Sequence, residues 1–212
     1  MRTRILIADD HTVVLQGLQR MLNRPEFEVV CAVQDGRALV ERAIALKPDL
    51  IIADISMPLL NGVEAIRQIE KLKLRVKIVC LSMHPDVAYA VEAIKAGAKA
   101  YLVKTSDDEE LLLAIKKVLA GELYITPSLE EVVLNHFRAP RASTNEQGPS
   151  LTQRQREVLQ LLAEGKQAKE IAALLDVSVR TVEFHKYRVM EVLAIRTVAG
   201  LAAYAAKNRI LP

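Results

Sequence analysis

The chain has 212 residues, of which 51% are hydrophobic and 26% are charged. This composition excludes an intrinsically disordered chain, and the length suits two modest hydrophobic cores. The two cysteines, Cys31 and Cys80, each lie inside an apolar run, so we expect core packing and no disulfide framework. No apolar stretch is long enough to span a bilayer, and we expect a soluble, cytoplasmic protein.

The charge is distributed unevenly along the chain. Residues 1–137 hold 17 Lys and Arg and 19 Asp and Glu, a net of −2, whereas residues 138–212 hold 12 and 7, a net of +5. The basic excess favours a polyanionic partner for the C-terminal part, although the signal is weak when it is taken alone.

Residues 1–121 alternate short β-branched runs with amphipathic segments. The runs that predict strands are Arg4–Ala8, Glu28–Val33, Leu50–Asp54, Lys77–Ser82 and Ala100–Val103. The segments that predict helices are Thr12–Asn23, Arg37–Leu46, Asn61–Lys71, Val87–Ala96 and Asp107–Ala120. Ser106 with Glu109 predicts a capping box for the last helix, and Gly121 predicts its end. This alternation predicts a parallel sheet covered by helices on both faces.

A polar segment rich in turn-forming residues, 139–150, marks a boundary. We expect a partly helical linker over residues 122–150 and a second domain over residues 151–212. The helices predicted in this domain are Gln153–Glu164, Lys169–Leu175, Val179–Leu193 and Val198–Lys207. Thr152 with Gln155 predicts a capping box for the first of them, and Ser178 is placed to cap the third.

Polar side chains follow the predicted strands at their carboxyl ends. Asp9 and Asp10 follow the first strand, Asp54 ends the third, Ser82 ends the fourth and Lys104 follows the fifth. The carboxyl ends of parallel strands meet at one edge of a sheet, so we expect these side chains to converge. Clustered carboxylates repel each other unless a cation neutralises them, and Mg²⁺ prefers such hard oxygen ligands. The pattern therefore predicts a magnesium site suited to phosphoryl transfer.

Residues 1–121 resemble the receiver domain of two-component response regulators. The resemblance rests on Asp9-Asp10, on the run 54–62 (Asp-Ile-Ser-Met-Pro-Leu-Leu-Asn-Gly), on Ser82, and on Tyr101-Leu-Val-Lys104. It implies a flavodoxin-like α/β fold with a five-stranded parallel sheet in the order 2-1-3-4-5.

The same resemblance implies a role for each residue of the site. Asp54 is expected to accept a phosphoryl group from a sensor histidine kinase, assisted by Lys104 and Ser82. Ser82 and Tyr101 are the expected switch residues. The chain would then be no enzyme beyond self-phosphorylation and self-dephosphorylation at Asp54. The expected Mg²⁺ site comprises Asp9, Asp10, Asp54 and the backbone carbonyl of Ser56.

Residues 151–212 resemble the LuxR-type helix-turn-helix domain. The resemblance rests on the runs 151–159 (Leu-Thr-Gln-Arg-Gln-Arg-Glu-Val-Leu), 162–166 (Leu-Ala-Glu-Gly-Lys), 169–172 (Lys-Glu-Ile-Ala) and 180–185 (Arg-Thr-Val-Glu-Phe-His). Together the two resemblances place the chain in the NarL/FixJ family and imply a transcription regulator that forms a homodimer on phosphorylation. Helix 179–193 would then enter the major groove of DNA. The residues expected at the duplex are Arg180, Thr181, Glu183, Lys186, Tyr187 and Arg188.

One position of this helix departs from the family pattern. Where a basic residue usually follows Thr-Val, the chain has Glu183, and the bulky Phe184 comes next. Glu183 either accepts a hydrogen bond from cytosine N4 or forms a salt bridge with Arg180 or Lys186. His185 is expected to be a structural, hydrogen-bonded histidine.

Two other functions stay open from the sequence. One is a Mg²⁺-dependent hydrolase of the phosphotransferase type that uses Asp54 as its nucleophile, although the chain has no insertion resembling a substrate lid. The other is an interaction module whose C-terminal helices bind protein or RNA, although the helix-turn-helix pattern favours duplex DNA.

Overall fold

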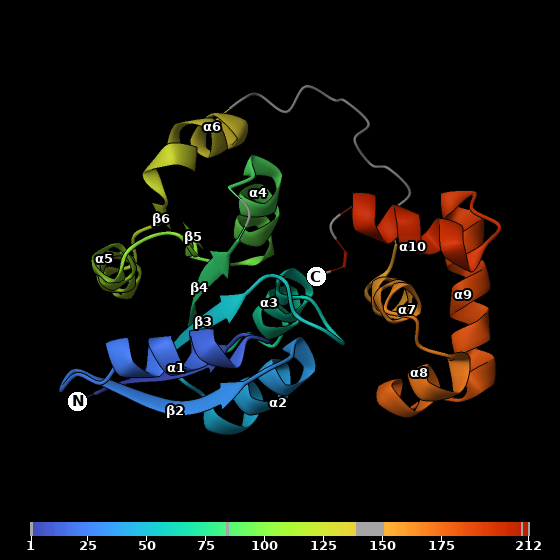
Figure 1. Ribbon diagram of the computed structural model, residues 1–212, viewed down its shortest axis with the longest axis horizontal. Coiled ribbons are helices and arrows are strands. Elements are labelled where there is room, and N and C mark those ends of the chain that lie inside the picture. Colours follow the sequence, from blue (N-terminus) through green and yellow to red (C-terminus); the bar gives the residue numbers. More distant parts are fainter. Residues whose placement is uncertain (1, 84, 139–150, 209, 212) are drawn as a thin grey trace. The chain divides into compact units, whose positions relative to one another are not determined.

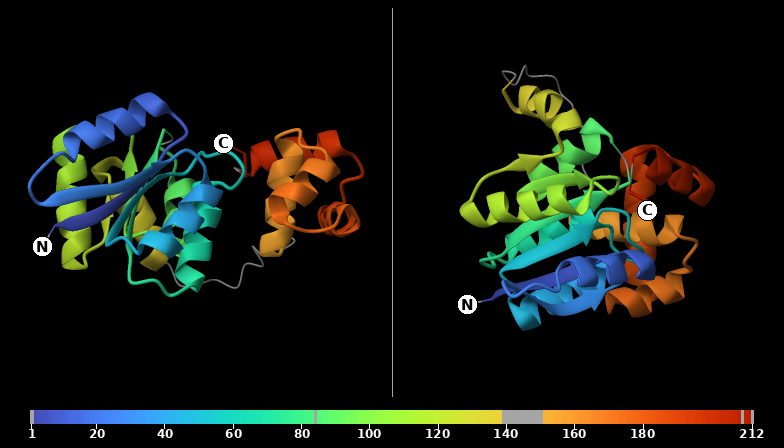
Figure 2. Two further views of the ribbon diagram at one scale, coloured as in Figure 1. Left: turned by 90° about the horizontal axis from the view of Figure 1, so that it is seen from below. Right: turned by 60° about the vertical axis from the view of Figure 1, so that its left-hand side comes forward.

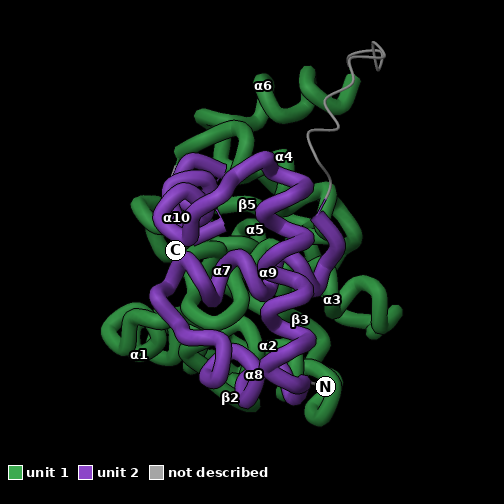
Figure 3. Tube along the Cα trace, turned by 90° about the vertical axis from the view of Figure 1, so that its right-hand side faces the viewer, with its two compact units in different colours: residues 1–140 green, residues 141–212 purple. Residues whose placement is uncertain are grey.

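The computed structural model describes residues 2–83, 85–138, 151–208 and 210–211. The chain divides into two compact units, unit 1 (residues 1–140) and unit 2 (residues 141–212), which Figure 1 and Figure 3 show. Each unit has a hydrophobic interior of its own.

Unit 1 is built on a parallel sheet with the strand order β2-β1-β3-β4-β5-β6 (Figure 1). The strands are β1 (Thr3–Ala8), β2 (Phe27–Val33), β3 (Leu50–Asp54), β4 (Lys77–Ser82), β5 (Ala100–Val103) and β6 (Tyr124–Ile125). Every residue of β3 is buried, because helices cover both faces of the sheet. This two-sided burial explains why the central strands are continuous apolar runs instead of alternating patterns.

The helices of unit 1 form two layers, one on each face of the sheet (Figure 2). One layer holds α1 (Thr12–Met21) and α5 (Asp108–Ala120), and the other holds α2 (Gly36–Leu46), α3 (Gly62–Lys71) and α4 (Val87–Ala96). Both layers pack through buried aliphatic residues such as Leu18 and Ile115 on one side and Leu39 and Ile66 on the other. The loops after β1, β3, β4 and β5 therefore gather at one edge of the sheet.

Residues 122–138 differ from the expected structure. The sequence predicts a five-stranded sheet followed by a partly helical linker over 122–150, but β6 adds a sixth parallel strand beside β5 and α6 (Pro127–Arg138) follows it. Buried Leu129 and Val133 join α6 to the core around α4. A two-residue strand shows no periodicity, so the sequence pattern does not reveal it. The rest of the expected linker, 139–150, lies outside the described residues.

The helix ends follow local hydrogen-bonding chemistry, with one change from the prediction. α5 is capped by Asp107, whose carboxylate accepts a hydrogen bond from the Glu110 amide, and not by Ser106. Both positions carry a capping residue with a glutamate three residues later, and the aspartate takes the role. As predicted, Gly121 ends this helix with a left-handed backbone, at φ 93°.

Unit 2 consists of α7 (Gln153–Ala163), α8 (Ala168–Leu175), α9 (Val179–Leu193) and α10 (Val198–Lys207). α7 packs against α9 and α10, and α8 packs against α9. The predicted capping box of Thr152 and Gln155 starts α7, and Ser178 caps α9. Asp176 ends α8 at φ 51° and turns the chain into α9, which makes α8 and α9 a helix-turn-helix pair.

Among the described residues, no single helix is both long enough and apolar enough to cross a bilayer. Taken together, α9 and α10 reach that length and composition, but they are bent by 65° relative to each other.

Candidate functional site

Three aspartates meet at the carboxyl edge of the sheet in unit 1. Asp9 follows β1, Asp10 begins the next loop and Asp54 ends β3. Together with His11 they each offer a ligand atom, and all four atoms lie within 4.8 Å of one another. Asp9 and Asp54 are buried, whereas Asp10 is half-buried. The predicted convergence of these carboxylates is what the structure shows.

The ammonium of Lys104 lies between two of these carboxylates. Its Nζ is 2.6 Å from Asp9 Oδ2 and 2.9 Å from Asp54 Oδ2, and the lysine side chain is 7% exposed. Burial raises the pKa of the Asp54 carboxyl, and the hydrogen bond from Lys104 opposes this rise. Burial by itself would lower the pKa of Lys104, but its bonds to Asp9 and Asp54 outweigh that effect and raise the pKa. Lys104 and these two carboxylates are thus buried together, and the single positive charge compensates only part of their negative charge.

The second oxygen of Asp54 has a different environment from the first. Oδ1 is buried and has no hydrogen-bond partner among the described residues. The backbone amide of Ser56 donates a hydrogen bond to the Asp54 carboxylate, so the loop after β3 helps to orient it. One oxygen of Asp54 is therefore held by Lys104, and a lone pair of the other stays available for chemistry.

The loop that follows Asp54 packs directly on the aspartate backbone. A Cβ added at Gly62 would lie 2.1 Å from the Asp54 carbonyl oxygen, so no larger residue fits without moving the loop. The Gly62 amide also donates to the Ile55 carbonyl at 2.8 Å, and Asn61 caps α3. The run Asn61-Gly62 thus fixes the chain close to the acidic cluster.

The two expected switch residues, Ser82 and Tyr101, lie on neighbouring strands. Ser82 ends β4, Tyr101 lies in β5, and both are fully buried. Their side chains form a hydrogen bond, and burial raises the pKa of the tyrosine hydroxyl. The Tyr101 side chain is therefore held in the interior of unit 1.

His11 is a member of the cluster that the sequence analysis did not single out. Its Nδ1 lies 2.7 Å from Asp10 Oδ1 and 3.4 Å from Asp9 Oδ1, while its side chain is mostly exposed. The only sequence feature that points to His11 is its position directly after Asp9-Asp10. A residue at that position is equally expected to begin α1. His84, two residues beyond Ser82, is not among the described residues.

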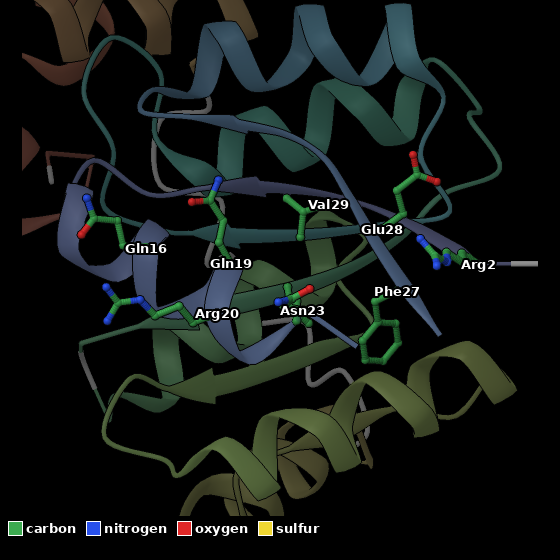
Figure 4. Close-up of a pocket in the computed structure, with 9 residues that line it drawn as sticks. Arg2, Gln16, Gln19, Arg20, Asn23, Phe27, Glu28 and Val29 are labelled. Carbon is green, nitrogen blue, oxygen red and sulfur yellow. The ribbon is translucent and has the colours of Figure 1, made fainter. Parts of the chain in front are cut away.

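A hollow of about 460 Å³ lies at the opposite edge of unit 1, between α1 and the beginning of β2 (Figure 4). Its polar side chains include Arg2, Gln19, Arg20 and Glu28, and all four are exposed. Figure 4 shows them spread along the rim without converging on one point. This hollow therefore has none of the buried, converging polar groups that mark the cluster around Asp54.

The outward face of α9 is the candidate DNA interface of unit 2. Val182 and Val189 are buried against the other helices. At 100° per residue, Arg180, Phe184 and Tyr187 lie on the opposite side, and all three are exposed. The other predicted contact residues border this face: Thr181 bonds to the capping Ser178, and Arg188 bonds to Glu191 at 2.6 Å.

Glu183 and Lys186 form an ion pair on the flank of α9. The lysine side chain is 19% exposed, and its Nζ lies 5.3 Å from the centre of the Tyr187 ring. Of the two cations expected as salt-bridge partners of Glu183, Lys186 and not Arg180 is the one that it contacts. Lys186 therefore points less directly outward than Arg180 does.

His185 lies on the inner flank of α9, near Arg154 and Glu157 of α7. Burial lowers the pKa of its imidazole, and the nearby Arg154 lowers it further. We expected a hydrogen-bonded histidine, but Nδ1 is buried without a partner among the described residues. The structural position is as expected, whereas the hydrogen bond is missing at this atom.

A doubly wound α/β unit with a buried acidic pocket, joined to a helix-turn-helix unit, defines a signal-dependent regulator of DNA. Comparison with known families agrees: residues 5–116 match the response regulator receiver domain, and residues 149–205 match the bacterial regulatory proteins of the luxR family. The chain belongs to the NarL/FixJ family of response regulators. It is a DNA-binding transcriptional regulator of a two-component system, and its two domain families are not typical of enzymes.

Similar proteins match over nearly the whole chain. The oxygen regulatory protein NreC of Staphylococcus haemolyticus is 38% identical, over 98% of this chain and 99% of its own length. A LuxR-family response regulator from Aurantimonas sp. is 31% identical, with a TM-score of 0.61 over 65% of this chain and 99% of that one. A structure of RcsB dimers bound to two parallel DNAs is 26% identical, with a TM-score of 0.61 over 97% and 98% of the two chains.

Proposed function

We propose that Asp54 is the phosphoacceptor of this regulator. The observation that carries the proposal is the asymmetry of its carboxylate: Oδ2 contacts Lys104 at 2.9 Å, while Oδ1 is buried and without a partner among the described residues. Oδ1 would attack phosphorus, forming an acyl phosphate as the phosphorus–nitrogen bond of a phosphohistidine in the sensor kinase breaks. Lys104 would then hold an oxygen of the transferred group.

The acidic cluster suits a divalent cation such as Mg²⁺. The carboxylates of Asp9, Asp10 and Asp54 supply hard oxygen ligands, with their atoms within 4.8 Å of one another, and the Ser56 carbonyl is the further ligand we expect. Bound there, the ion would neutralise the carboxylates and the charge on the transferring phosphoryl group. Asp9 would support the site while it also bonds Lys104.

Ser82 and Tyr101 would carry the signal out of the pocket. The Ser82 hydroxyl now bonds to Tyr101. If Ser82 turns towards a phosphoryl group on Asp54, Tyr101 loses that partner, and the surface beside β4 and β5 changes its preferred packing. The release of Tyr101 from Ser82 is the step that we propose. A homodimer would form in response.

Unit 2 would bind duplex DNA through the outward face of α9. Arg180 is exposed at the start of this helix, and Tyr187 and Arg188 follow on the same side. Thr181 sits at the capped end of the helix, and Glu183 with Lys186 borders the face. A protein that regulates transcription through bacterial DNA works in the cytoplasm, and we propose this location.

The test is a selection of genomic fragments with and without phosphorylation. The protein is incubated with acetyl phosphate and Mg²⁺, or with Mg²⁺ alone, and the bound fragments are sequenced. We expect a defined set of sites enriched in the phosphorylated sample. Equal enrichment in both samples would contradict control through Asp54, and enrichment of no DNA would contradict the DNA-binding function.

A further inference from the structure

Two aromatic side chains on the outward face of α9 are largely exposed. Phe184 is 59% exposed and Tyr187 is 63% exposed. The chain has three Phe, of which Phe27 is buried, whereas Phe137 on α6 and Phe184 on α9 are exposed. Exposing a phenylalanine costs free energy in water, and Phe184 carries no polar atom that would offset this cost. Within unit 2 its ring has an edge contact with the neighbouring His185, with ring centres 5.5 Å apart, and most of its surface stays exposed.

The charges around Phe184 indicate what could cover it. Arg180 lies one turn before it and Arg188 one turn after it, both exposed on the same face. Arg180 forms no ion pair within the described part of the chain, whereas Arg188 is paired with Glu191 and the acidic Glu183 is paired with Lys186. An apolar ring between two arginines suits a polyanion that also presents an apolar group where this face of the helix contacts it. Duplex DNA meets this description better than an apolar protein surface does.

We propose that Phe184 is a specificity-determining residue that contacts the 5-methyl group of a thymine in the major groove. This methyl is the apolar group that the bases present in that groove, and phenylalanine is among the side chains that pack on it. The inference rests on the DNA-binding function and adds what part of the base is recognised. Arg180 and Arg188 contact phosphates or base edges on either side. Phe184 distinguishes thymine from the other bases by its apolar contact with the methyl group.

Tyr187 has a different role in this arrangement. Its ring lies beside the Lys186 ammonium, at 5.3 Å from Nζ to the ring centre, and its hydroxyl is able to donate a hydrogen bond. A tyrosine of this kind fits a phosphate oxygen at the edge of the groove, where it positions the helix without reading sequence. The thymine preference is therefore assigned to Phe184 alone.

The first experiment compares wild type with Phe184→Ala in a selection from a randomised duplex library. One position at which wild type requires thymine should become unselective with the variant. Phe184 is exposed, so the variant keeps the core of unit 2 intact. Phe137→Ala is the matched control, because this phenylalanine is 44% exposed but lies on α6 of unit 1. The control should keep every preference of wild type.

The second experiment removes only the methyl group. At the position found above, thymine is replaced by deoxyuridine in an otherwise identical duplex. Wild type should lose about fourfold in affinity per half-site, the equivalent of one buried methyl, whereas Phe184→Ala should bind both duplexes equally. The proposal is overturned if the selection with Phe184→Ala keeps every thymine preference, or if deoxyuridine costs both proteins the same. DNA binding itself would be intact in either result, so the two failures are distinguishable.

Discussion

The acidic pocket around Asp54 and the outward face of α9 differ in how their charges are exposed to solvent. In the pocket, charges are buried and compensate one another, with Lys104 held between Asp9 and Asp54. On α9, charges are exposed or paired at the flank, as Glu183 is with Lys186. Buried pairs are strongly interdependent, whereas exposed ones are screened by water and salt. Substitutions in the pocket should therefore abolish a function, and those on α9 should tune one.

The largest expected effect is the loss of phosphorylation in Asp54→Asn. The amide has nearly the same shape, but it lacks the nucleophilic carboxylate on which an acyl phosphate forms. Incorporation of label from acetyl phosphate should fall to background. Asp176→Asn is the matched control: Asp176 ends α8 in a left-handed conformation that asparagine also adopts, so labelling should match wild type. Labelling of Asp54→Asn at the wild-type level, or labelling that a chelator leaves unchanged, would refute the assignment.

The next effect tests how far the pocket depends on its own cation. Lys104→Met leaves Asp9 and Asp54 buried beside each other without compensation, which should destabilise unit 1 by about 3 kcal/mol when chelator is present. Hydrogen exchange of the β3 amides should then be about 100-fold faster than in wild type. Added Mg²⁺ should recover part of the loss, because the ion replaces the missing positive charge.

Lys95→Met provides the control for this prediction. Lys95 is 47% exposed and lies 3.7 Å from the exposed Glu92, so its removal should leave exchange unchanged. If the β3 amides of Lys104→Met exchange at the wild-type rate in chelator, Asp9 and Asp54 are not buried from solvent as the structure indicates. If Mg²⁺ restores nothing, the acidic cluster is not its binding site.

The same contrast explains which features could be predicted from the sequence. Asp9, Asp54 and Lys104 lie far apart in the chain, but each ends or follows a strand, and parallel strands bring their carboxyl ends together. The position of the pocket therefore follows from the pattern of strands alone. β6 could not be predicted, because two residues carry no period, and α6 buries only Leu129 and Val133 on its core side.

Side-chain orientation was harder to predict than backbone position. Ser106 and Asp107 each precede a glutamate by three residues, so the sequence allows either as the cap of α5, and hydrogen bonding selects Asp107. Lys186 was expected to face DNA, but it lies only 40° from the direction of buried Val182 on an ideal helix, and Glu183 holds it there. These choices depend on contacts between neighbours, and periodicity does not encode them.

On α9, Arg180 should contribute more to DNA affinity than Lys186. Arg180 is exposed, and among the described residues no carboxylate pairs with it, whereas Lys186 is 19% exposed and paired with Glu183. Arg180→Ala should weaken binding and lower the slope of log affinity against log salt by about one per subunit. Lys186→Ala should change the slope by less. Titrations at two salt concentrations measure the affinity and its salt slope for each variant. A larger slope change for Lys186→Ala than for Arg180→Ala would show that another side of α9 faces the duplex.

The smallest effect is expected from Glu183→Ala, and its pattern matters more than its size. The carboxylate is bonded to Lys186, so we expect its removal to free a cation and to remove a negative charge near the phosphates. Affinity should then rise a few-fold for the selected site and for random DNA alike, and the rise should shrink as salt is added, because exposed charges are screened.

If Glu183 accepted a hydrogen bond from cytosine, the variant would instead lose on the order of 1–3 kcal/mol on the selected site only and relax its preference at one position. Glu183→Gln separates the two roles further, because glutamine keeps a hydrogen-bond acceptor but not the charge that holds Lys186. A variant that binds random DNA as wild type does, but binds the selected site more weakly, would overturn the restraining role and make Glu183 a reader of sequence beside Phe184.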